Sequence, residues 1–154
     1  MYSYRPVAPG DLELICRHRY EMFKDSGRAE AILVPMTKTF RPWLERKLNS
    51  GAYFGWIAEA DGKPVAGLGM MVIDWPPHPN HAEDDRRGYV LNVYVEPEHR
   101  GCGVAKALMD MAMVAARERD LRFVVLHATA KGRPVYEKLG WKQTPEMGIA
   151  LSVP

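Results

Sequence analysis

Residues 89–119 read YVLNVYVEPEHRGCGVAKALMDMAMVAARER and join a predicted β-strand to a predicted α-helix. The first part, Tyr89–Val95, is apolar and rich in the β-branched and aromatic residues that favour strands. Ala105–Arg119 has the periodicity and the residues of an amphipathic helix. The strand therefore enters the helix through the turn Arg100–Ala105, which contains two glycines.

This turn has the composition of an anion-binding site. Glycine lets the backbone approach a ligand closely, and the first N–H groups of a helix have no partner inside it. The helix dipole and an arginine add positive charge at the same place. The expected ligand is a phosphate or pyrophosphate; a helix start that binds nothing is the alternative. The candidate residues are Arg100, Gly101, Cys102, Gly103, Val104 and Ala105.

Two common phosphate-binding motifs fit this chain poorly. The sequence contains no GxxxxGK[ST] run, and the third glycine position of a GxGxxG fingerprint is occupied by Lys106. Arg-x-x-Gly-x-Ala at residues 100–105 instead resembles the coenzyme A motif of the GNAT N-acetyltransferases. A second stretch, GRPVYEKLGW at residues 132–141, is similar to the final-helix motif of that family. The resemblance extends over about Val65–Trp141.

The resemblance implies an α/β fold of the acyl-CoA N-acyltransferase type, with helices flanking a mixed central sheet. It also implies acetyl-CoA as co-substrate. In this family the pantetheine arm pairs with the edge of the central strand, here Val93, Tyr94 and Val95, where the next strand splays away. Thr129 is expected to hydrogen-bond the arm, and Arg133 to pair with the phosphates of the coenzyme.

The implied reaction is direct transfer of the acetyl group to a primary amine of a small molecule or protein. Tyr136 matches the position of the family's general acid, which protonates the departing thiolate. A tyrosine that only packs on the sheet is the plain alternative. A second function also stays open, namely a coenzyme A-binding sensor or regulatory module without turnover. A phosphate-loop domain for another nucleotide is a third, which the 132–141 match disfavours.

The general base is not evident, because Tyr89–Val95 contains no acidic residue. Alternation along the strand predicts Asn92 on the face opposite Leu91, Val93 and Val95. A buried asparagine needs a partner and is a candidate for orienting the substrate or a water. The candidates for a base are Glu59, His127, His81, Asp84 and Asp85; a water relay is equally compatible.

The acceptor is expected to contact the first two helices and the long loop Asp74–Arg87, because long loops often carry function. Candidate contacts are Arg19, Phe23 and Trp75. Arg19 interrupts an apolar helical stripe, where an arginine either extends to solvent or lines a pocket. With the acidic residues 83–85, the aromatic residues suggest a cationic or aromatic amine.

The remaining elements complete the order β-α-α-β-β-β-α-β-α-β. Helices are predicted from Asp11 to about Lys24 and over Thr39–Leu48, and a final strand over Met147–Val153. Asp61-Gly62-Lys63 separates two strands, Ala52–Ala60 and Pro64–Asp74, as a hairpin turn does. We expect residues 1–154 to form a single domain.

Composition limits the partners. The net charge of +2 with dispersed basic residues disfavours nucleic acid as a ligand. No apolar run is long enough to span a membrane, and residues 1–11 lack the apolar core of a signal peptide. Cys16 and Cys102 form no metal-binding or disulfide pattern, so we expect no metal and a cytoplasmic location. The resemblance adds a homodimer as the expected assembly.

Overall fold

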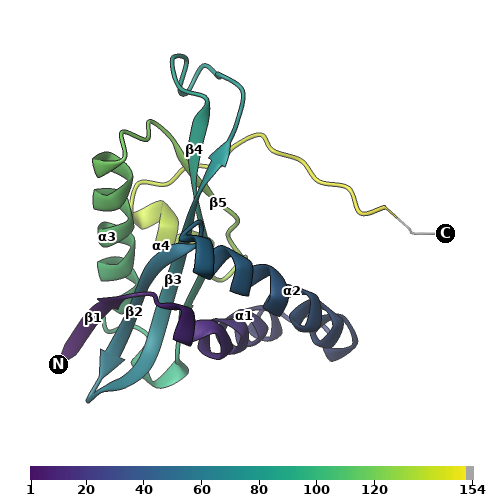
Figure 1. Ribbon diagram of the computed structural model, residues 1–154, viewed down its shortest axis with the longest axis vertical. Helices are drawn as coiled ribbons and strands as arrows, with labels where there is room; N and C mark the ends of the chain where they lie inside the picture. Colours follow the sequence, from purple (N-terminus) through teal and green to yellow (C-terminus); the bar gives the residue numbers. More distant parts are fainter. Residues whose placement is uncertain (152–154) are drawn as a thin grey trace.

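Five strands form one mixed sheet in the order β1-β2-β3-β4-β5, and the computed structural model describes residues 1–151 (Figure 1). Strands β1 to β4 pair antiparallel, whereas β5 pairs parallel to β4. The elements are β1 (Tyr2–Pro6), α1 (Leu12–Asp25), α2 (Glu30–Ser50), β2 (Phe54–Ala60), β3 (Lys63–Asp74), β4 (Arg86–Val95), α3 (Val104–Glu118), β5 (Val124–Leu126) and α4 (Arg133–Lys138). Two short 3₁₀ helices are η1 (Pro9–Asp11) and η2 (Pro97–His99).

The hairpin between β2 and β3 turns at Asp61 and Gly62, as predicted. Both residues have positive φ angles, 50° and 73°, as a two-residue type I′ turn requires. This turn pairs Ala60 with Lys63 and fixes the register of β2 against β3.

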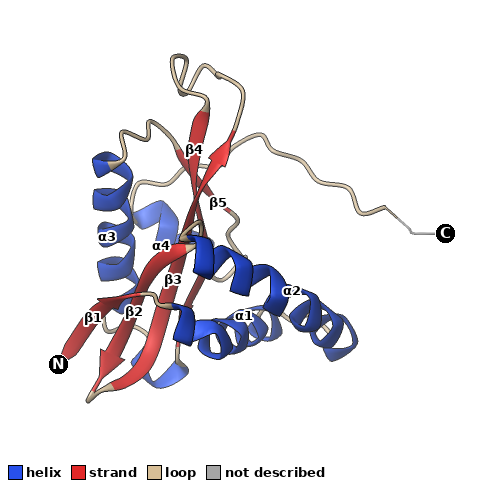
Figure 2. Cartoon of the chain, in the orientation of Figure 1, coloured by secondary structure: helices blue, strands red, loops and turns tan. Residues whose placement is uncertain are grey.

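The sheet separates two apolar clusters (Figure 2). Helix α3 covers one face, and Leu108 and Ala112 pack there against Leu68, Met70 and Val90. On the other face α1 and α2 cover the sheet. Their buried residues Ile15, Cys16, Phe40, Leu44 and Leu48 pack with Tyr53. The two faces therefore have different neighbours, which matters for the site described below.

A β-bulge interrupts β4 at Asn92. Gly67 pairs with Tyr94 and Gly69 with Leu91, so a single residue of β3 lies opposite two residues of β4. Asn92 has φ 54°, a left-handed conformation that asparagine tolerates better than most residues. The bulge turns the Asn92 side chain toward α1 and α2, on the same face as Leu91. The prediction that Asn92 and Leu91 lie on opposite faces is therefore wrong, whereas Val93 and Val95 do lie on the α3 face.

Several predicted boundaries differ from the structure, most of all those of α2 and β5. Helix α2 begins at Glu30, nine residues before the predicted start, and includes Pro35 and Pro42. Each proline removes one helical hydrogen bond, but packing of Leu33, Phe40 and Leu44 keeps the helix continuous. Strand β5, which the apolar run predicts over Phe123–His127, has only three residues.

The predicted final strand, Met147–Val153, is absent over Met147–Leu151, and its last two residues lie outside the described part of the chain. A strand needs a neighbouring edge, and residues 142–151 instead extend away from the sheet (Figure 1). The other nine predicted elements occur in the predicted order. Within residues 1–151, no helix combines the length and apolar character needed to cross a membrane.

Candidate active site

The turn before α3 presents a set of unpaired backbone N–H groups. Gly101 and Gly103 have φ angles of 75° and 81°, which L-residues with side chains rarely adopt. Within residues 1–151, the N–H groups of residues 101–106 donate to no protein acceptor, and the first helical bond is Ala107 N–H to Gly103 C=O. These groups and the start of the α3 dipole converge at one place. The turn thus has the geometry to bind a phosphate or pyrophosphate.

The side chain of Arg100 makes contacts on the opposite side of the chain from α3. Its Nη2 atom lies 2.6 Å from Asp25 Oδ2 at the end of α1, and its Nε donates to the Val95 carbonyl at 2.9 Å. The Asp25 carboxylate supports the charged guanidinium, and the pKa of Arg100 is raised above its ordinary value although burial opposes the rise. Arg100 therefore anchors the turn to α1 and β4.

Strands β4 and β5 separate after three residue pairs. The parallel ladder joins Gly88 to Val124, Tyr89 to Val125 and Val90 to Leu126, and then ends. Within residues 1–151, the edge of β4 that faces β5 has no strand partner from Leu91 to Val95, as the resemblance implied. This open edge contains Val93, Tyr94 and Val95, and it leads to the turn at residues 100–105. An extended ligand with amide groups has the chemistry to pair with such an edge.

Tyr136 lies on the α3 face, half-buried in α4. Its ring packs against the main apolar cluster and lies edge-on to Trp141, with ring centroids 6.3 Å apart. The hydroxyl donates no hydrogen bond within residues 1–151. Burial raises the pKa of the Tyr136 hydroxyl above its ordinary value of 10, so the group stays protonated at neutral pH. A protonated hydroxyl is what a general acid requires.

Thr129 and Arg133 have local partners around the start of α4. Thr129 Oγ1 accepts the N–H of Gly132 at 3.0 Å, which stabilises the turn that leads into the helix. The Arg133 guanidinium pairs with Glu137 at 2.7 Å on the exposed side of the helix. Thr129 keeps its hydroxyl hydrogen for a further bond, and surface ion pairs such as Arg133–Glu137 are weak.

A polar cluster on the α1 face surrounds the bulge. Asn92 Nδ2 donates to the Tyr53 hydroxyl at 3.1 Å, and Arg19 Nη1 donates to Asn92 Oδ1 at 2.7 Å. Both Asn92 and Tyr53 are buried. A side chain at position 69 would overlap the Tyr53 hydroxyl, so glycine is required there for Tyr53 to occupy its place. The buried asparagine thus has the partners that the sequence predicted it would need.

Phe23 and Phe40 flank the guanidinium of Arg19. The Arg19 Cζ atom lies 5.0 Å from the centroid of the Phe23 ring and 4.7 Å from that of Phe40, within the range of cation–π contacts. Burial lowers the pKa of Arg19 from its ordinary value. The structure therefore brings together two of the three residues predicted to contact the acceptor.

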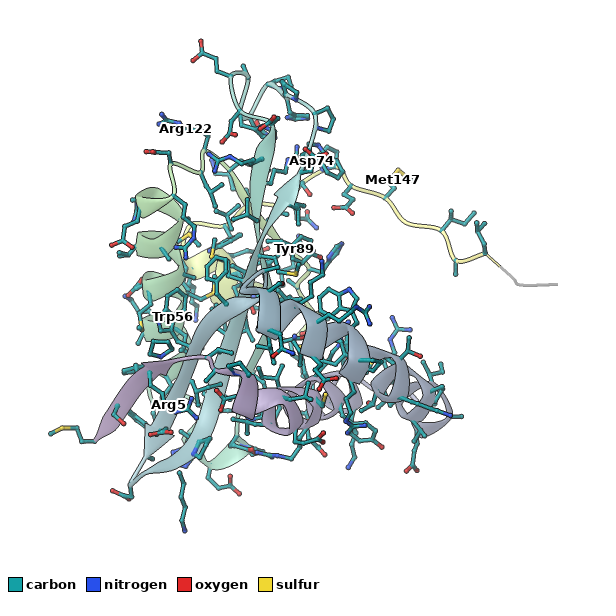
Figure 3. The ribbon with its side chains drawn as sticks, viewed as in Figure 1. Arg5, Trp56, Asp74, Tyr89, Arg122 and Met147 are labelled. Carbon is teal, nitrogen blue, oxygen red and sulfur yellow. The ribbon has the colours of Figure 1, made fainter. Side chains whose placement is uncertain are left out.

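The third, Trp75, lies elsewhere. It stacks on the Arg87 guanidinium at 4.5 Å, and Phe123 contacts the other side of that group. Its neighbour Asp74 is labelled at the far end of β3, away from α1 and α2 (Figure 3). The long loop is held by its own contacts, because His81 bonds to the Asp84 carbonyl and accepts from Arg87.

The other candidate bases occupy different surroundings. Glu59 accepts from Arg5 Nε at 2.7 Å beside β1. His127 directly follows β5, at the point where the two strands part, and it hydrogen-bonds the Tyr89 hydroxyl. Its Nε2 lies 3.5 Å from Glu146. Within residues 1–151, no cluster of three or more histidine, cysteine or acidic residues is arranged to hold a metal ion.

Sequence reasoning missed Tyr53 and Phe40 as parts of this cluster. Both belong to the apolar core by type and spacing, and their polar or cationic partners come from distant elements. Gly69 gave an indirect signal, because a glycine inside a strand indicates a bulge or a close approach.

Comparisons with known proteins agree with this geometry. Residues 17–141 match the acetyltransferase (GNAT) family. A GCN5-related N-acetyltransferase from Ralstonia eutropha JMP134 is 48% identical, with a TM-score of 0.96 over 98% of this chain and 99% of that one. A predicted acetyltransferase from Clostridium acetobutylicum, crystallised with acetyl-CoA, is 32% identical, with a TM-score of 0.87 over 99% and 96% of the chains.

Human N-acetyltransferase 8B is 32% identical over 92 residues. That match covers 58% of this chain and 38% of the human protein, so the chain corresponds to well under half of that relative. The solved structures, in contrast, match over nearly their whole length and have the predicted α/β fold with helices on both sides of a mixed sheet.

Proposed function

The chain belongs to the acetyltransferase (GNAT) family, and from this premise we propose that it transfers the acetyl group of acetyl-CoA directly to a primary amine. The acceptor is a small molecule or a protein amino group. One observation carries the proposal: an open stretch of β4 leads to a turn of unpaired N–H groups, and the half-buried Tyr136 packs on the α3 face of the sheet with Val93 and Val95. The three features match the pantetheine arm, the pyrophosphate and the leaving thiolate.

Acetyl-CoA fits the residues that are present. The N–H groups of residues 101–106 would hold the pyrophosphate, and the edge Val93–Val95 would pair with the pantetheine amides. Two glycines keep the turn free of side chains where the phosphates approach. Thr129 and Arg133 are the proposed contacts near α4. The thioester then lies where β4 and β5 part.

The reaction needs a neutral amine, a stabilised oxyanion and an acid for the thiolate. The amine loses a proton and its nitrogen forms a bond to the thioester carbon. A backbone N–H at the open edge of β4 stabilises the resulting oxyanion. The C–S bond then breaks, Tyr136 donates its proton to the sulfur, and the nitrogen loses its second proton, which restores the Tyr136 hydroxyl.

The proton from the amine has two routes. His127 is the base that its position favours, because it lies at the parting of the strands, whereas Glu59 is engaged by Arg5. A chain of waters that passes Asn92 is the second route, in which the asparagine orients but does not accept the proton. If His127→Gln lowers kcat at neutral pH, the proton leaves through His127, which is the first route.

Thermal melting of the full chain with added acetyl-CoA tests the coenzyme site. A ligand that binds only the folded state stabilises it by about 2.7 kcal/mol at a hundredfold excess over Kd. We expect the wild type to respond and an Arg100→Glu, Gly103→Glu variant, folded but carrying two negative charges at the turn, to lose the response. Arg117→Glu, on the far part of α3, is the matched control. A folded wild type that shows no response would refute the proposal.

A coenzyme A-binding module without turnover is the second candidate, favoured by the absence of a carboxylate on β4. An amine screen that follows release of free thiol separates the two functions. Binding of acetyl-CoA without acetylation of any amine would select the binding module.

We further propose that two copies of the chain associate through their C-terminal segments. Met147, Ile149 and Leu151 alternate along this segment and are 94%, 85% and 82% exposed. Such spacing is typical of a strand with one apolar face. Figure 3 shows Met147 on the extended C-terminal segment. An extended apolar segment of this kind is costly to leave in water.

The same chain carries a matching acceptor. The outer edge of β5 has no strand partner within the described residues, and an open groove of about 1070 Å³ lies beside it, lined in part by Val124, Leu126, Leu139 and Trp141. Residues 142–148 of the same chain line part of this groove, but within the described residues they form no strand with β5. A second copy is therefore the proposed source of the strand that covers this edge.

A further inference from the structure

One arginine of the chain, Arg41, binds a carboxylate through two hydrogen bonds. Arg41 on α2 uses its side-on edge, the Nε and Nη2 atoms, to donate to the two oxygens of Glu13 at 2.7 and 2.8 Å. This bidentate fork is the geometry in which guanidinium groups recognise carboxylates.

Arg19 offers the same edge without an occupant. Its Nε is buried and has no hydrogen-bond partner, and within residues 1–151 its Nη2 donates to no protein atom. The third nitrogen, Nη1, is engaged by Asn92 at 2.7 Å. The side chain is thus held in one orientation by its neighbour on β4, while the Nε–Nη2 edge has no acceptor within residues 1–151. A buried donor without a partner needs an explanation.

The surroundings of Arg19 supply no counter-charge. Two phenyl rings, Phe23 and Phe40, flank the guanidinium, and within residues 1–151 no Asp or Glu forms an ion pair with it. A cation that is partly removed from water without an opposite charge is unfavourable. An anion that arrives with a ligand would satisfy both the charge and the unpaired Nε.

The position of Arg19 relates this fork to the proposed reaction. Arg19 contacts Asn92 at the bulge, within the open stretch of β4 and just before Val93–Val95, along which the coenzyme arm is proposed to lie. The cluster is on the face covered by α1 and α2, opposite the face on which Tyr136 packs. An acceptor would therefore enter from the α1 side, with the leaving group on the α3 side.

We propose that Arg19 binds a carboxylate of the acceptor, so that the substrate is an amine of the amino-acid type. This proposal rests on the proposed function. A carboxylate is favoured because its two coplanar oxygens match the Nε–Nη2 edge, and because two aromatic rings pack close to the guanidinium. The expectation of a cationic or aromatic amine rested in part on the acidic residues of the long loop, and the described contacts of Asp84 are within that loop.

Matched acceptor pairs test the proposal. Each pair differs by one carboxylate: phenylalanine and phenethylamine, tyrosine and tyramine, histidine and histamine, alanine and ethylamine. Glucosamine and its 6-phosphate form a pair for the alternative anion. We expect kcat/KM to favour the carboxylate member of at least one pair, and Arg19→Gln to reduce that preference by about tenfold to a hundredfold. Arg19→Lys, which keeps the charge but loses the fork, should retain part of it.

Arg17→Gln is the matched control, because Arg17 lies two residues away, is exposed and pairs with Glu96. It should leave the preference unchanged. Equal loss for both members of every pair in Arg19→Gln would show that Arg19 only positions Asn92, and would overturn the proposal. A preference confined to the phosphate pair would overturn the carboxylate assignment.

A binding measurement separates this proposal from the proposed function. If acetyl-CoA stabilises the protein but no amine is acetylated, the transferase function fails, and melting with CoA and each pair member decides the role of Arg19. Stabilisation by the carboxylate members alone, abolished in Arg19→Gln, would support the site. No difference within any pair would refute it.

Discussion

At the level of single residues, Tyr136 combines burial with an unengaged hydroxyl. Its ring is fixed by the apolar cluster and by Trp141, while burial raises the pKa of the hydroxyl. Tyr136→Phe keeps the ring and removes the proton donor. We expect kcat to fall by roughly a hundredfold, with acetyl-CoA binding unchanged, as measured by thiol release and by melting. Tyr20→Phe is a suitable control, and an unchanged kcat in Tyr136→Phe would remove the acid role.

His18 gives a second prediction at this scale. Its imidazole is 2% exposed, lies 5.0 Å from the Tyr94 ring, and has a buried Nε2 without a hydrogen-bond partner. Burial lowers the pKa of His18 to about 4, Arg17 acts in the same direction, and Glu96, at 3.7 Å, opposes the shift. The folded protein therefore binds fewer protons than the unfolded chain between pH 6.5 and 4.

Above pH 6.5 His18 is neutral in both the folded and the unfolded state. As the pH falls from 6.5 toward 4, only the unfolded chain gains a proton at His18, and the free energy of unfolding decreases. The free energy of unfolding should drop by roughly 3 kcal/mol across this window. Urea denaturation at several pH values between 7 and 4.5 measures the slope. In His18→Gln the slope should be much smaller, because the carboxyl groups with lowered pKa values, Asp11 and Glu13, lose their contribution only at lower pH. An equal slope in the variant would contradict this account.

At the level of elements, the bulge in β4 depends on a glycine in the neighbouring strand. A Cβ at position 69 would overlap the Tyr53 hydroxyl, and Tyr53 supports Asn92. Gly69→Ala should therefore cost about 1–3 kcal/mol of stability and weaken acceptor binding, measured as KM. Gly10→Ala is the control, since nothing lies within 4 Å of that position. A variant as stable as the wild type would show that Tyr53 moves freely.

The same elements show which features the sequence predicts well. The turns at Asp61-Gly62 and at residues 100–105 depend on local backbone conformation, and glycine marks them directly. The central helix and the hairpin follow from hydrophobic periodicity. These local features give the part of the site that we propose binds the coenzyme.

Other features depend on contacts between distant residues and were missed for that reason. Strict alternation placed Asn92 opposite Leu91, whereas the bulge arises from pairing with β3 and from the room that Gly69 provides. Helix α2 continues through Pro35 because burial of its apolar side offsets the free energy of the hydrogen bond that the proline removes. The predicted strand Met147–Val153 has the alternating residue pattern of a strand. Whether it forms depends on a neighbouring strand with which it can pair.

At the level of the whole molecule, the proposed dimer depends on the C-terminal segment. Ile149→Asp places a charge in the middle of the proposed strand, and we expect it to convert a dimer to a monomer by size-exclusion chromatography with light scattering. Val114→Asp, an exposed apolar position on α3, is the matched control and should stay dimeric. A monomeric wild type would refute the dimer.

The short parallel ladder between β4 and β5 also divides the molecule into regions of unequal local stability. Three residue pairs and the six-residue helix α4 hold the segment after α3, whereas the first four strands have long ladders. Amide hydrogens of residues 124–138 should therefore exchange with solvent faster than those of β2 and β3, through local opening. Because the proposed coenzyme site has contacts on both sides of the parting strands, acetyl-CoA should slow exchange most in that segment. The segment 124–138 would then reach its full local stability, and the enzyme its active form, only when acetyl-CoA is bound.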